Sequence, residues 1–129
     1  MKTARIGLLA VGLLFAASPA PAQVTVSADT IARAKAAFQQ VEDGKIDRST
    51  LTPVFNALLT DDVLSVLEQR ANALGMPDRF APVGQTDTDG VTTTVFRLHF
   101  PTGNLDLTFG IDDATNKIAK LYFVPGPPS

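Results

Sequence analysis

Residues 80–124 read FAPVGQTDTDGVTTTVFRLHFPTGNLDLTFGIDDATNKIAKLYFV, and this segment sets the architecture of the chain. Runs in which apolar and polar residues alternate are separated by clusters of turn-forming residues at 87–90, 101–104 and 112–117. Strand side chains point alternately to the two faces of a sheet, so the alternation indicates strands with one buried face. The segment therefore predicts three or four consecutive antiparallel strands, of which 80–88 is the weakest.

The turn Pro101-Thr102-Gly103-Asn104 predicts the register of the central hairpin. If Phe100 faces Leu105 across this turn, the large apolar side chains of both strands share one face of the sheet. These side chains are Phe96, Leu98, Phe100, Leu105, Leu107 and Phe109. A shift of one residue would expose the phenylalanines to water, so the alternation specifies which face is buried.

The last strand, 118–124, predicts a second hairpin whose register follows from placing Ala119 beside Ile111. Two further pairs then lie on the buried face, Leu121 with Phe109 and Phe123 with Leu107. The other face carries Ile118, Lys120, Tyr122 and Val124. Because most of these side chains are apolar, this face is expected to be partly covered or to form a partner surface, such as that of a homodimer.

Amphipathic segments precede the strands and predict helices that cover the apolar face of the sheet. The first is expected to run from an N-cap at Ser27 to about Glu42. The second is short, with Asp47 or Ser49 as its N-cap and Pro53 near its start.

The third helix is expected to begin at Thr60 and to end at Gly75. One side of each helix is expected to be buried. These sides comprise Ile31, Ala34, Phe38 and Val41 in the first, Leu51, Val54, Phe55, Leu58 and Leu59 in the second, and Val63, Leu64, Val66, Leu67, Ala71 and Leu74 in the third. Helices followed by a meander of about four strands predict an α+β fold, in which helices pack on one face of a curved antiparallel sheet.

Residues 1–22 have the features of a secretory signal peptide. A positively charged start precedes an apolar run at 6–17, and a small-residue cleavage motif ends at Ala22. We expect residues 23–125 to form one domain and 126–129 to be a disordered tail. The mature protein is then expected in the periplasm or outside a bacterial cell, with no membrane span left after removal of the signal.

The chain has 129 residues and a net charge of −2, with no basic run. This composition argues against nucleic acid and anionic membrane surfaces as partners. The absence of cysteine excludes a disulfide framework, and with one histidine we expect neither a metal site nor a cofactor. The eight phenylalanines instead supply material for a hydrophobic core.

Four segments carry a likeness to a known family, namely 52–75 (TPVF through LG), VFRLHF at 95–100, DLTFGID at 106–112 and KIAKLYFVP at 117–125. They resemble the NTF2-like superfamily, also called the steroid-isomerase-like or cystatin-like cone. Within it, the chain is similar to small domains of unknown function, one version of which precedes the serine β-lactamase-like domain of some exported hydrolases. The resemblance implies a pocket between the helices and the sheet.

The function that the resemblance implies is that of an exported, non-catalytic domain that binds a small apolar ligand or a protein partner. One alternative is a small enzyme of the steroid-isomerase or cyclase kind. Another is an accessory domain for a separately encoded β-lactamase-like or penicillin-binding enzyme. The chain contains neither Ser-x-x-Lys nor Lys-Thr-Gly, so any β-lactam chemistry would belong to that separate protein.

The predicted register places His99 opposite Asp106 on the polar face, with Arg97 opposite Thr108 beside them. A carboxylate that orients an imidazole is the centre of many general-base sites. The pair is therefore either a catalytic dyad or a structural cross-strand pair. We favour the structural pair, because the pocket that the resemblance implies lies on the other face of the sheet.

The candidates for ligand binding are phenylalanines on the inner faces of the helices and strands, with Arg79 at the mouth of the pocket. These phenylalanines are Phe38, Phe55, Phe96, Phe100 and Phe109. An apolar cavity with a few polar groups is the usual form of a small-molecule site. The alternative is a filled core, because aromatic side chains at helix and strand spacing usually pack against one another.

Overall fold

The computed structural model describes residues 25–127, so the expected signal peptide at 1–22 lies outside the described residues. The helical elements come first: α2 (Ala28–Glu42), the short 3₁₀ helix η2 (Arg48–Thr50), α3 (Pro53–Leu58) and α4 (Asp61–Ala73). The strands follow: β1 (Arg79–Thr88), β2 (Val91–Phe100), β3 (Gly103–Asp112) and β4 (Ile118–Pro125).

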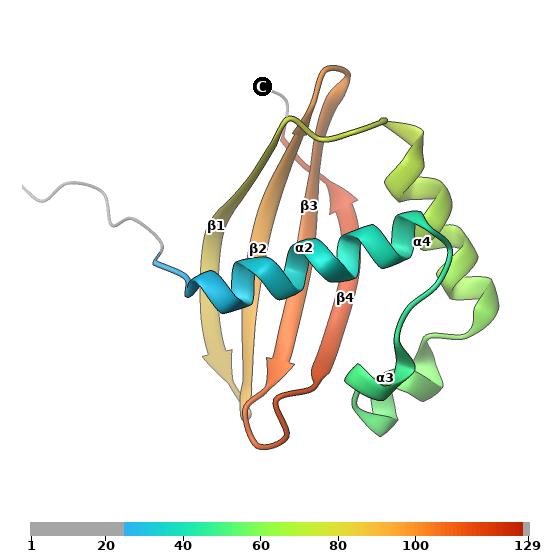
Figure 1. Ribbon diagram of the computed structural model, residues 1–129. Coiled ribbons are helices and arrows are strands. Elements are labelled where there is room, and N and C mark those ends of the chain that lie inside the picture. The colour runs from blue at the N-terminus through green and yellow to red at the C-terminus, as the bar shows by residue number, and fades with distance from the viewer. Residues whose placement is uncertain (1–24, 128–129) are drawn as a thin grey trace, which may run out of the picture.

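The strands form one four-stranded antiparallel sheet in the order β1-β2-β3-β4. Figure 1 shows α2 lying across one face of this curved sheet, with α4 beside β4 and the connection from α4 passing over the end of the sheet to β1. The prediction of an α+β fold with helices on one face of an antiparallel sheet is confirmed. Within residues 25–127, no helix has the length and apolar character needed to cross a membrane.

The first and third helices begin where the sequence predicts. The Ser27 side chain accepts a hydrogen bond from the Thr30 amide at 3.1 Å, and the Thr60 side chain accepts one from the Val63 amide at 3.3 Å. Each bond satisfies an amide that has no partner inside the helix.

The single second helix of the prediction is divided in two. Asp47 caps η2 by accepting a bond from the Ser49 amide at 3.0 Å, and Thr52 caps α3 by accepting one from the Phe55 amide at 3.1 Å. The cause is Pro53, which lacks an amide hydrogen and disfavours helical geometry in the residue before it. The helix η2 therefore ends at Thr50, and a new helix, α3, begins at Pro53.

The core lies between α2, α4 and the inner face of the sheet. The six side chains predicted to share one face of the central hairpin are all buried. Phe38 of α2 packs edge-on against two strand residues, with ring centroids 6.2 Å from Phe80 and 5.6 Å from Phe123. These contacts fix α2 across the sheet, from its first strand to its last.

The register of the central hairpin differs from the prediction by two residues. Phe100 pairs with Gly103 and Leu98 pairs with Leu105, so the turn is shorter than expected. A shift of two residues keeps every side chain on its predicted face, because the alternation has a period of two. It changes the opposing residues, and Arg97 rather than His99 lies opposite Asp106.

The second hairpin confirms the predicted pairs of Leu107 with Phe123 and Phe109 with Leu121. The prediction for Ile118 is wrong, because this residue is buried in the core. The register shifts between Gly110 and Ile111, and Ile118 pairs with Ile111. An extra residue at such a bulge reverses the direction of the side chains beyond it.

At the outer edge of β4, some backbone groups are paired with residues from the helical half of the chain. The Thr52 amide donates to the Ile118 carbonyl at 2.9 Å, beside a parallel bridge between Leu51 and Ile118. The Arg70 guanidinium donates to the Phe123 carbonyl at 3.4 Å. At the opposite edge of the sheet, the pairing of β1 with β2 is interrupted between Pro82 and Gly84.

Some residues predicted to be on the buried side of a helix are exposed. Val54 and Leu58 of α3 have 73% and 66% of their surface exposed, and Val63 and Val66 of α4 are also exposed. The helix α3 has only six residues and is anchored through Phe55, so its other sides face away from the core. The helix α4 turns Leu64, Leu67 and Ala71 inward, a narrower stripe than predicted.

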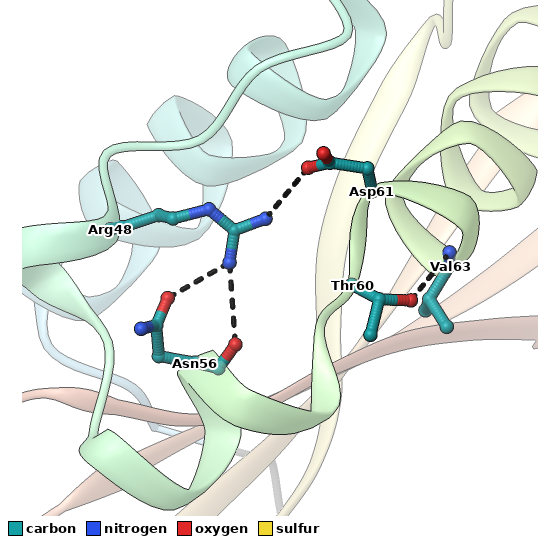
Figure 2. Close-up of polar contacts among 5 residues, drawn as sticks. All are labelled: Arg48, Asn56, Thr60, Asp61 and Val63. Carbon is teal, nitrogen blue, oxygen red and sulfur yellow. Dashed lines mark hydrogen bonds and ion pairs between the residues drawn. The ribbon is translucent and has the colours of Figure 1, made fainter.

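One arginine connects three of the helical elements (Figure 2). The Arg48 guanidinium, from η2, donates to the Asn56 side-chain oxygen at 2.8 Å and to the Asn56 carbonyl at 3.3 Å. Its other terminal nitrogen lies 3.4 Å from a carboxylate oxygen of Asp61. The start of α4 is thus connected to the end of α3 and to η2 through one side chain.

Candidate ligand clefts

Aromatic and charged side chains surround a cleft between α2 and the connection from α4 to β1. We call it the α2 cleft, and its volume is about 290 Å³. The helix contributes Lys35, Phe38, Gln39 and Glu42, and residues 76–80 form the opposite wall. The helical residues are spaced so that they share one side of α2.

The floor of the α2 cleft is aromatic. Phe38 is buried and Phe80 is half-buried, and their rings meet edge-on. The Lys35 ammonium lies 5.8 Å from the centroid of the Phe80 ring, within the range of a cation–π contact. Met76 stands at the rim with 73% of its surface exposed. An apolar group in the cleft would therefore contact both aromatic rings and the methionine.

The rim of the α2 cleft carries charges of both signs. Lys35 and Arg79 supply the positive charges, and Glu42 and Asp78 supply the carboxylates. Burial raises the pKa of the Glu42 carboxyl group, and repulsion by the neighbouring Asp43 carboxylate raises it further. The sequence reasoning missed Glu42. Its helical spacing from Lys35 and Phe38 is the signal that could have placed it beside them.

The structure brings together two of the predicted ligand-binding residues, Phe38 and Arg79, which both line the α2 cleft. The other four predicted residues are placed elsewhere. Phe96, Phe100 and Phe109 have no exposed surface and belong to the core, and Phe55 is buried on α3. Their aromatic rings fill the space between the helices and the sheet.

The predicted opposition of His99 and Asp106 is wrong. Asp106 accepts two hydrogen bonds from Arg97, at 2.9 Å from Nε and 3.0 Å from Nη2. His99 lies opposite Asn104, and its Nδ1 is 2.6 Å from a carboxylate oxygen of Asp78. The physical cause is the shorter hairpin turn, which moves each residue of β2 past its expected partner. The hydrogen bond to Asp106 raises the pKa of the Arg97 guanidinium.

A second cleft lies on the face of the sheet that the helices leave open. We call it the sheet-face cleft, and its volume is about 390 Å³. It is lined by Arg79, Ala81 and Val83 of β1, Arg97 and His99 of β2, Asn104 of β3, and Pro127. Gly126 and Pro127, expected in a tail, are hydrogen-bonded to Asn104, and Pro127 forms one side of this cleft.

Within residues 25–127, no three histidine, cysteine, aspartate or glutamate side chains gather closely enough to hold a metal ion. Comparison with known proteins gives no family for the chain. No protein-family model matches it, and neither does any curated protein sequence or solved structure.

Proposed function

We propose that the chain is an exported, NTF2-like binding domain that holds a small, mainly apolar ligand in the α2 cleft. The observation that carries the proposal is the pairing of an aromatic floor, Phe38 and Phe80, with the cationic groups of Lys35 and Arg79 at the rim. The cleft volume, about 290 Å³, lies near the lower end of the range for small-molecule sites.

The chemistry of the rim suggests the form of the ligand. Its apolar part would lie against the aromatic rings, where removal from water is favourable. A polar or anionic end would lie near Lys35 and Arg79, because cations stabilise a negative charge most strongly where solvent is partly excluded.

Export is supported by the sequence pattern of residues 1–22, and the NTF2-like assignment by the resemblance of the later segments. The isomerase alternative requires a carboxylate and a tyrosine within one cavity. Glu42 lines the α2 cleft, whereas Tyr122 is exposed on the other face of the sheet. This separation favours the binding role over the enzymatic one.

The test uses the dye 1-anilinonaphthalene-8-sulfonate, which combines an apolar body with an anionic group. We expect saturable binding by the purified protein, and we expect Met76→Glu to weaken it about tenfold by placing a charge at the apolar rim. The matched control is Val66→Glu, an exposed residue on α4 that does not line the α2 cleft. Non-saturable binding, or equal weakening by both variants, would contradict the proposal.

A second role is favoured by the open face of the sheet. Tyr122 and Val124 lie on this face of β4 with 48% and 43% of their surface exposed, as the sequence predicts. We propose that this face binds a second copy of the chain. Because Ile118 is buried in the core, the proposed contact is formed by these two side chains and by Thr108, which lies opposite Tyr122 on β3.

A further inference from the structure

The sheet-face cleft has the residues of an anion site, and it is separate from the α2 cleft. Its cationic groups come from neighbouring positions on two strands, since Arg79 pairs with His99 across β1 and β2. Directly cross-strand side chains on one face have their Cβ atoms about 5 Å apart. A single small anion can therefore contact both side chains at once.

The charge of Arg97 is balanced and its position is fixed. Its guanidinium donates two hydrogen bonds to the Asp106 carboxylate, which is largely buried beside it. Paired contacts of this kind hold the planar guanidinium in one orientation. Arg97 therefore serves as a rigid, neutralised wall of the cleft and not as its free charge.

His99 is also oriented by a carboxylate. Its Nδ1 lies 2.6 Å from Asp78 Oδ1, and the Asp78 amide donates to the His99 carbonyl at 2.8 Å. An ionised carboxylate only accepts hydrogen bonds, so Nδ1 carries the hydrogen of this contact. The other ring nitrogen, Nε2, is left for a ligand, and Asp78 balances any positive charge on the ring.

Arg79 is the cation without a counter-charge. Within residues 25–127 its guanidinium has neither a hydrogen-bond nor an ion-pair partner, and its side chain is exposed. It offers five N–H groups in the fork geometry that matches a carboxylate. The cleft beside it has an apolar wall, formed by Ala81, Val83 and Pro127.

We propose that the sheet-face cleft binds a small carboxylate with a compact apolar body. Arg79 pairs with the carboxylate, His99 contacts it from the neighbouring strand, and the apolar body lies against the wall formed by Ala81, Val83 and Pro127. This inference does not depend on the function proposed for the α2 cleft. The two share only Arg79, which borders both clefts.

The experiment is a titration of the protein with benzoate, followed by the imidazole resonances of His99 at fixed pH. His99 is the only histidine of the chain, so its signals need no assignment. We expect saturable shifts with benzoate and none with benzamide, an uncharged molecule of similar shape. The absence of shifts with benzoate, or equal shifts with both probes, would overturn the proposal.

Variants locate the site. We expect Arg79→Gln to weaken benzoate binding at least about tenfold, and Arg79→Lys to weaken it less, because lysine keeps the charge and loses the fork. Lys35→Gln removes a cation from the α2 cleft alone and should leave the affinity unchanged, as should Met76→Glu. Unchanged binding by Arg79→Gln, with its amide spectrum still that of a folded protein, would rule the site out. Because Arg79 borders both clefts, the unchanged affinity of Lys35→Gln and Met76→Glu is the result that distinguishes this site from the α2 cleft.

Discussion

Glu42, near the end of α2, connects the α2 cleft to the stability of the protein. Its carboxyl group has a raised pKa because burial disfavours the charged form and Asp43 repels it. The folded state therefore binds this proton more tightly than the unfolded chain does. At a pH below 4.5, the ordinary pKa of glutamate, the stabilisation from protonation of Glu42 is fully present. It is lost as the pH rises from 4.5 through the raised pKa of the folded state.

We expect Glu42→Gln to raise the free energy of unfolding at neutral pH by about 0.5 kcal/mol, since solvent screens a partly exposed charge and keeps the gain small. At a pH below 4.5 the variant and the natural protein should have equal stability, because the glutamate is then protonated. Urea denaturation at the two pH values measures both differences. A gain that persists at the lower pH would show that the carboxylate charge is not its source.

At the same scale, burial is predicted more accurately from the sequence than cross-strand pairing is. The alternation around Phe96 and Leu98 identifies the inner face, and it is insensitive to a two-residue shift. The partners of Asp106 depend on the length of the turn at Pro101, which alternation does not encode. The predicted His99–Asp106 pair was wrong for this reason, and the Arg97–Asp106 pair was missed.

At the scale of elements, Arg48 connects η2, α3 and α4 where these segments have little core of their own. Its bonds to Asn56 use the carbonyl at the end of α3, which would otherwise lack a partner within the helix. The contact with Asp61 is longer, and that carboxylate is almost fully exposed, so the ion pair contributes little. The stabilisation that Arg48 provides therefore comes mainly from its hydrogen bonds to Asn56.

We expect Arg48→Ala to lower the free energy of unfolding by about 1 kcal/mol, the usual value for hydrogen bonds of this kind. Asp61→Asn is the matched control, and its effect should stay below about 0.5 kcal/mol because the charge is screened. Thermal and urea denaturation give both values. If the two substitutions cost the same, the ion pair and not the bond to Asn56 is the stabilising contact.

Element boundaries could be predicted where one residue type determines them. Ser27 and Thr60 identify helix starts because their side chains bond to the amides that follow. The side of each helix that faces the core was harder to predict in the short α3. An apolar residue such as Val54 or Leu58 indicates burial only when a neighbouring element covers it, and that depends on how far α3 extends over the sheet.

At the scale of the whole molecule, local pattern and global fold agree, and this agreement explains why the α+β architecture could be predicted. The α2 cleft could not be predicted in full, because it joins residues 35–42 to residues 76–80. Only the packing of α2 across the sheet brings these two segments together. Phe38 and Arg79 were identified as candidates separately, with no pattern in the sequence that connects them.

We expect the open face of the sheet to make the protein a dimer at tens of micromolar, as measured by light scattering. Tyr122→Glu should shift the mass to that of a monomer, because a charge at an apolar contact resists burial. Val63→Glu is the control, since this exposed valine belongs to α4 on the helical side. A monomeric mass for the unsubstituted protein would contradict the proposed contact.

The two edges of the sheet, β1 and β4, are protected from strand addition by different means. Along β4, Thr52 and Arg70 already donate to the carbonyls of Ile118 and Phe123. Along β1, Pro82 has no amide hydrogen to offer, and the irregular pairing beside it disturbs the line of the strand. An extended segment of another chain therefore finds no continuous template on either flank. Both edges are therefore poor starting points for fibril-like growth.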